Sequence, residues 1–219
     1  MSSMSRSEYI ARWGQTHGGY DANASFLART WLGFAYTFTR PLIAMRLTPN
    51  AITFLGLLIS VVALWPAALG GRWAIVTALL FLKAGLFDQL DGAVALMTDS
   101  STKWGAVFDA VCDRISDGVF LVAFWLLGAP VWSCVLAGAL MMLHEYLRAR
   151  AAAAGMNEIG VVTVWERPTR VIIAVMFSLA AGIFVGSADI WAREASFAWI
   201  VLGVIGIFQL TRVVRKELA

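Results

Sequence analysis

The chain has 219 residues, of which 60% are hydrophobic and only 14% are charged, and its mean hydropathy is +0.75. A soluble domain of this size is about a quarter charged, so the composition excludes an ordinary soluble protein and indicates a single-domain polytopic membrane protein. A net charge of +3 is too small to point to nucleic acid, and two cysteines are too few for a four-cysteine metal site.

The chain begins with a polar arm, residues 1–23, that lacks the apolar core of a secretory signal, and we expect little fixed structure there. Residues 24–47 mix arginines with aromatic and aliphatic side chains. This mixture predicts an amphipathic helix that lies in the membrane interface and is bent or broken at Pro41. We interpret residues 48–219 as one transmembrane domain, whose first helix is opened by the sequence "TPN".

Apolar segments predict an all-α fold with six transmembrane helices, at residues 50–69, 73–97, 104–127, 130–151, 168–187 and 195–213. The loops on one side of these segments hold most of the arginines and lysines, whereas the turns on the other side hold only Arg72 and Arg193. Basic residues mark the cytoplasmic side of a membrane protein. We therefore expect a plasma-membrane protein with both termini in the cytoplasm.

Aspartates are concentrated where the second predicted span ends and the third begins, in the stretch "FDQLDGAVALMTDSSTKWGAVFDAVCDRISDG". Asp88 and Asp91 are three residues apart, and Asp109, Asp113 and Asp117 follow one another at intervals of four. Spacings of three and four place side chains on one face of a helix. A short loop joins the two helices, so we expect them to be antiparallel and their carboxylates to meet near the cytoplasmic side.

Such carboxylates need compensation, because each one near the middle of a membrane costs about 2.5–3.5 kcal/mol. The basic groups within the spans, Lys83 and Arg114, cannot neutralise them all. Ligand sets made only of oxygen suit Mg²⁺, Mn²⁺ or Ca²⁺, and pairs of such ions bridged by carboxylates are common in phosphoryl transfer. A cation or proton transporter is the alternative from another class of protein.

Asp99 differs from these aspartates, because it lies in the serine-rich loop, where we expect it to be solvated or to cap a helix.

The aspartates belong to a longer pattern that resembles the signature of the CDP-alcohol phosphotransferase family: Asp88-x-x-Asp91-Gly92-x-x-Ala95, then nine residues, then Gly105-x-x-x-Asp109-x-x-x-Asp113. The resemblance covers roughly residues 45–215 and includes "TPNAIT" at the first span. It implies a homodimeric catalytic domain of six spans with two divalent metal ions, Mg²⁺ or Mn²⁺. It also implies that a phosphatidyl group moves from CDP-diacylglycerol to an alcohol, with release of CMP.

The resemblance assigns roles residue by residue. Four carboxylates match metal ligands, and the last of them also matches the general base: Asp88, Asp91, Asp109 and Asp113. Five further residues match nucleotide or donor contacts: Asn50, Thr53, Gly92, Ala95 and Gly105. One position departs from the pattern, because Leu96 stands where the family has an arginine. We therefore expect a cation to be missing near the donor.

Arginines at the end of span four and the start of span five point to a phosphorylated acceptor: Arg148, Arg150, Arg167 and Arg170. Clustered arginines bind phosphate oxygens, although positive-inside topology is a competing explanation. The stretches "STKWGAVFDAVCDRISDG" and "ERPTRVII" resemble actinobacterial phosphatidylinositol-phosphate synthases, in which basic residues at the positions of Arg148, Arg150 and Arg170 hold the phosphate of inositol phosphate. We expect inositol phosphate as the acceptor, with glycerol 3-phosphate or phosphatidylglycerol as alternatives.

Overall fold

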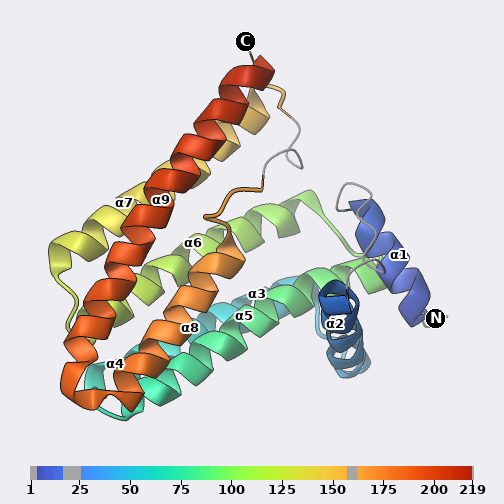
Figure 1. Cartoon of the computed structure of the whole chain (residues 1–219). Coiled ribbons are helices and arrows are strands. Elements are labelled where there is room, and N and C mark those ends of the chain that lie inside the picture. Colours follow the sequence, from blue (N-terminus) through green and yellow to red (C-terminus); the bar gives the residue numbers. More distant parts are fainter. Residues whose placement is uncertain (1–3, 17–25, 157–161, 219) are drawn as a thin grey trace. The chain divides into compact units, whose positions relative to one another are not determined.

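The structure, a computed structural model, describes residues 4–16, 26–156 and 162–218. All regular secondary structure in these described residues is helical, as the composition and the apolar segments predict (Figure 1). The helices fall into two compact units. The first comprises the described parts of residues 1–56 and 86–112, and the second those of residues 57–85 and 113–219.

The N-terminal arm, expected to have little fixed structure, contains a helix, α1 (Arg6–Thr16). A reciprocal cap starts it: the Glu8 backbone N–H donates to Ser5 Oγ (3.3 Å), and the Ser5 N–H donates to the Glu8 carboxylate (2.7 Å). These bonds lower the pKa of Glu8 below its ordinary value. The spacing Ser-x-x-Glu is a helix-start signal that was present in the sequence, and it explains why our expectation for this segment was wrong.

The second helix of the first unit, α2 (Phe26–Ala44), lies close to the predicted range and continues through Pro41 without a break. It packs against α1 and ends where Arg46 adopts a positive φ of 57°. Beyond Pro41 its apolar side chains join Leu47 in a small core with buried residues of two later helices: Ile52, Leu90 and Val94.

Each of the next helices begins and ends close to the prediction. The first predicted span is divided into α3 (Pro49–Val62) and α4 (Leu64–Leu69), and Thr48 caps its start by accepting a hydrogen bond from the Ala51 N–H (3.3 Å). The helices α5 (Trp73–Thr98) and α6 (Lys103–Leu126) follow, and each contributes one part to each unit.

Three further helices complete the second unit: α7 (Val131–Ala153), α8 (Arg167–Ile183) and α9 (Ala188–Leu218), the last preceded by the short turn η3 (Val185–Ser187). Both α7 and α8 pack along α9 (Figure 1). The core of this unit combines alanines with large aromatic residues, and Trp199 is fully buried with its ring edge-on to Trp165 at 5.1 Å. The last helix begins earlier than the predicted span of 195–213, because the turn before it takes only three residues, and it also continues to Leu218.

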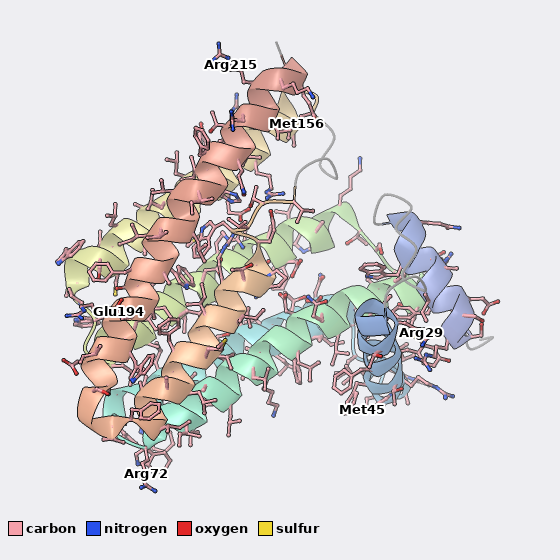
Figure 2. All side chains as sticks on the ribbon, in the orientation of Figure 1. Arg29, Met45, Arg72, Met156, Glu194 and Arg215 are labelled. Atoms are coloured by element: carbon pink, nitrogen blue, oxygen red, sulfur yellow. The ribbon has the colours of Figure 1, made fainter. Side chains whose placement is uncertain are left out.

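Three helical segments among the described residues are long and apolar enough to cross a membrane: Pro49–Leu69, Trp73–Thr98 and Val185–Leu218. The helix α8 has 17 residues, and charged side chains interrupt the apolar runs of α6 and α7. Within the second unit, Arg72 and Arg215 lie at opposite ends (Figure 2).

Candidate functional site

A pocket of about 410 Å³ lies within the first unit. Its lining includes five of the residues that the sequence pattern singled out: Asp88, Asp91, Gly92, Ala95 and Asp109. The first four come from α5 and the last from α6. The spacing of three on α5 therefore directs both of its aspartates to one cavity, which Asp109 of α6 also lines. Asp117, which we expected to share this face of α6, pairs with Arg170 instead.

Asp91 is the most firmly held of these carboxylates, with only 5% of the residue exposed. It accepts a hydrogen bond from the Thr53 hydroxyl of α3 (2.5 Å) and another from the Gly92 backbone N–H (2.5 Å). Gly92 has open space where a side chain would begin, since a Cβ there would meet no heavy atom within 4 Å. A ligand can therefore approach the α5 backbone closely at this point.

Asn50 and Gly105, predicted as donor contacts, also lie together. A Cβ on Gly105 would come within 3.2 Å of the Asn50 side-chain oxygen and within 3.0 Å of Thr102 Oγ1. The same Thr102 oxygen caps α6 by accepting a hydrogen bond from the Gly105 N–H (2.9 Å). The tight approach between α3 and the start of α6 thus depends on the absence of a side chain at Gly105.

The donor set of the pocket fits a divalent metal ion. Asp88 and Asp109 each offer a carboxylate oxygen, and these oxygens lie within 4.8 Å of one another. Two ionised carboxylates at this distance repel each other unless a cation lies between them. Carboxylate oxygens are the ligands that Mg²⁺ and Mn²⁺ prefer, and Asp91 adds a third in the same pocket. Asp113 follows Asp109 by one turn of α6.

The structure adds lining residues that the sequence did not suggest. Tyr9 and Trp13 of α1 and Leu32 and Ala35 of α2 lie on the wall of the same pocket. Burial raises the pKa of Tyr9 to about 12, so its hydroxyl stays neutral and adds no negative charge to the pocket. No local pattern could have revealed these contacts, because more than 50 residues separate them from the aspartates.

The second unit contains the four arginines of the predicted cluster, and Arg170 is the most buried of them. Its side chain is fully buried. It donates to Asp117 Oδ2 (2.5 Å), to the Trp165 carbonyl (3.0 and 3.2 Å) and to Glu145. Arg170 thus holds the two carboxylates in place in this structure, and the expected contact with an acceptor phosphate stays a prediction.

The other arginines are more accessible. Arg150 is exposed, Arg148 pairs with Glu166 (2.6 Å), and Arg167 pairs with Asp113 Oδ1 (2.9 Å) and also donates to the Asp113 backbone carbonyl (3.0 Å). Arg114 pairs with Asp117 (3.1 Å) and with Glu145 (2.8 Å).

Together these residues form a network of four carboxylates and four guanidinium groups: Asp113, Asp117, Glu145, Glu166, Arg114, Arg148, Arg167 and Arg170. The charges within it balance. The glutamate partners were not among the residues that the sequence pattern singled out. The interval of three between Glu145 and Arg148, and the same interval between Arg114 and Asp117, was the available signal.

Comparison with known proteins identifies the family. The model of the CDP-alcohol phosphatidyltransferase family matches residues 46–209. The chain belongs to this family. Its relatives include the phosphatidylinositol phosphate synthase of Mycobacteroides abscessus, which is 33% identical over 181 residues (78% of each chain). They also include the archaetidylinositol phosphate synthase of Pyrococcus horikoshii, which is 32% identical over 151 residues (67% of this chain and 77% of the relative).

Two crystal structures of the Mycobacterium tuberculosis phosphatidylinositol phosphate synthase share the fold. The complex with manganese and citrate gives a TM-score of 0.68 at 31% identity, covering 81% of this chain and 87% of the other. The complex with CDP-DAG gives a TM-score of 0.64 at 30% identity, covering 80% of this chain and 92% of the other. The likeness therefore extends over most of both chains.

The convergence of carboxylates predicts that metal and nucleotide bind together. Replacing Asp88 by asparagine keeps the shape of the side chain and removes its charge, so we expect metal-dependent binding of CDP to fall below detection. Isothermal titration of the purified protein with CDP in the presence and absence of Mn²⁺ measures this. Glu194→Gln, at an exposed carboxylate of α9, is the control and should bind as the unaltered chain does. Unchanged binding in Asp88→Asn would show that the metal site lies elsewhere.

The buried position of Arg170 predicts a loss of stability when it is removed. Arg170→Ala leaves the buried Asp117 carboxylate without its closest cation, which typically costs about 3–5 kcal/mol. We expect a clear fall in the melting temperature of the detergent-solubilised protein, followed by tryptophan fluorescence, whereas Arg150→Ala at an exposed site should melt unchanged. An Arg170→Ala variant that melts normally but shows a raised acceptor KM would restore the direct phosphate contact that the resemblance implies.

Proposed function

We propose that this protein transfers the phosphatidyl group of CDP-diacylglycerol to inositol phosphate and releases CMP. The observation that carries the proposal is the pocket in which Asp88, Asp91 and Asp109 meet, with the family signature around it. The acceptor is inferred from the relatives. A bacterial and an archaeal enzyme that differ in the lipid part of their product are both named for an inositol phosphate product.

The donor would occupy the pocket of the first unit. Gly92 and Ala95 line it, and the close backbone approach at Gly92 suits the flat base or the diphosphate. Asn50, Thr53 and Gly105 would contact the donor as the family signature implies.

Two divalent ions, Mg²⁺ or Mn²⁺, would be held by four carboxylates: Asp88, Asp91, Asp109 and Asp113. The M. tuberculosis relative was crystallised both with manganese and with CDP-DAG, which supports this assignment. Bound metal would neutralise the diphosphate and offset the charge that develops on the leaving CMP.

Asp113 is the proposed general base. Its ion pair with Arg167 (2.9 Å) holds the carboxylate in one position. The acceptor hydroxyl oxygen would attack the phosphorus that carries the diacylglycerol, and a new P–O bond would form as the bond to CMP breaks. The hydroxyl proton would pass to Asp113.

The acceptor phosphate would contact the more accessible arginines of the second unit, Arg148, Arg150 and Arg167. Each guanidinium group can donate two parallel hydrogen bonds to two phosphate oxygens, and several of them together can balance the double negative charge of the acceptor phosphate. Arg170 would act through Glu145 and Asp117, which it holds by ion pairs. In this proposal the pocket residues bind the donor, and the arginines bind the phosphate of the acceptor.

We further propose six membrane spans, a plasma-membrane location with both termini in the cytoplasm, and a homodimer. The charges that interrupt α6, α7 and α8 are paired with one another in the ion network, so these helices can enter a bilayer at a lower cost than their hydropathy suggests. The opposite placement of Arg72 and Arg215 at the ends of the second unit suits the predicted topology (Figure 2).

The acceptor assignment is tested with purified protein in lipid, supplied with CDP-diacylglycerol and Mg²⁺ or Mn²⁺. We expect CMP release with inositol phosphate and little release with glycerol 3-phosphate, phosphatidylglycerol or unphosphorylated inositol. Faster release with glycerol 3-phosphate or phosphatidylglycerol would reassign the acceptor and keep the chemistry. No CMP release with any acceptor would overturn the proposed function.

The base assignment predicts that Asp113→Asn lowers kcat by roughly 10²–10⁴-fold, because the amide keeps the shape of the side chain but cannot accept the proton. The affinity for CDP in the presence of Mn²⁺ should fall less than in Asp88→Asn. Steady-state CMP release and calorimetric titration measure the two quantities separately. A variant that loses CDP affinity as completely as Asp88→Asn would make Asp113 a metal ligand first and leave the base unassigned.

A further inference from the structure

The N-terminal helix α1 joins the wall of the donor pocket, although it lies outside the range that the family model matches. It is attached to α5 by an apolar cluster that contains Tyr9 and Ile10 of α1 and Ala93 of α5, with Leu96 packed against them. Leu96 is the residue that stands where the family signature has arginine. Its apolar side chain has a structural reason in this chain, because α1 docks on it.

The pocket itself is short of positive charge. Among the described residues that line it, three are aspartates and none is lysine or arginine. A donor with a diphosphate brings further negative charge to this place. Metal ions bound by the aspartates would offset part of that charge, and a guanidinium at the wall would stabilise the remainder.

Arg12 places a guanidinium at that wall. Its Nη1 donates to the backbone carbonyl of Leu96 (3.2 Å), and its Nη2 lies 3.4 Å from Asp99 Oδ1. Leu96 lines the pocket, so the guanidinium of Arg12 lies beside a lining residue, the one that stands where the family signature has arginine. The Asp99 side chain is 85% exposed, and a pair of this length at the surface is weak. A diphosphate can therefore compete with Asp99 for the guanidinium.

We propose that Arg12, delivered by α1, is a phosphate-binding residue of the donor pocket and takes the place of the arginine that the family signature has at position 96. Tyr9 and Trp13 of the same helix close the wall beside it. The inference rests on the proposed function, because it takes the ligand to be a CDP-linked donor. It makes α1 part of the donor site, where the sequence had indicated only a polar arm.

A purely structural role for Arg12 makes a different prediction. Its bond to Leu96 also satisfies a carbonyl near the end of α5, where a positive charge stabilises a helix. Loss of such a cap would lower the stability of the protein and would weaken the binding of any ligand in the pocket to a similar extent. Loss of a phosphate contact would weaken only ligands that carry phosphate.

The test compares CDP with cytidine in equilibrium binding to the detergent-solubilised full chain in the presence of Mn²⁺. Arg12→Gln keeps a side chain that can donate a hydrogen bond and has similar helix propensity, but it removes the charge. We expect its affinity for CDP to fall about five- to fiftyfold, with the affinity for cytidine and the melting temperature nearly unchanged. The matched control is Arg6→Gln, which removes the same charge from the same helix at a residue that donates to the Arg29 carbonyl instead.

A second substitution tests whether the charge can be supplied from the position that the family uses. Leu96→Arg introduced into Arg12→Gln should recover most of the lost CDP affinity. Equal CDP affinity in Arg12→Gln and the unaltered chain would overturn the proposal, as would equal losses for CDP and cytidine with a lowered melting temperature. If the protein with Leu96→Arg does not fold, the binding of CDP and cytidine to Arg12→Gln alone still tests the proposal. Failure of the unaltered chain to bind CDP would instead overturn the proposed function.

Discussion

Every ionised carboxylate among apolar helices needs an opposite charge nearby, and this requirement explains the arrangement of the charged residues in this protein. In the second unit the chain provides the countercharges itself. Asp117 has no exposed surface, and Arg114 and Arg170 both reach it. An ion pair of this kind is costly to bury and still more costly to break, so it commits α6, α7 and α8 to one arrangement.

The first unit has a group of carboxylates, Asp88, Asp91 and Asp109, in a pocket whose described lining contains no basic side chain. A pocket with three carboxylates and, among its described lining, no lysine or arginine suits a ligand that carries its own positive charge. Divalent metal ions meet this requirement, and they are also what a diphosphate donor needs.

The helix α1 shows how one change in a signature can be accommodated. Leucine at position 96 removes a cation from α5 and at the same time creates an apolar surface on which Tyr9 and Ile10 pack. The helix that packs there carries Arg12, whose guanidinium returns to the Leu96 carbonyl. The motif lacks a cation at position 96, and a cation from another part of the chain, Arg12, lies beside that position instead.

The sequence by itself determined the helical class, most helix boundaries and the carboxylates of the pocket. These features depend on local rules: apolar runs make helices, Thr48 and Thr102 cap them, and intervals of three and four place aspartates on one face. The family signature is equally local, since it lies on two consecutive helices. The capping box of Ser5 and Glu8 is local as well, because its two residues are three positions apart.

Only the tertiary structure decided which charges meet across the chain. The burial of Arg170 against Asp117 and Glu145 joins residues 25 and 53 positions apart, and the bond from Arg12 to Leu96 joins residues 84 apart. No periodicity encodes such pairs, because they depend on how whole helices pack and on which side chain is long enough to cross between them. For the same reason an arginine motif alone could not distinguish a phosphate-binding residue from one enclosed by its own carboxylates.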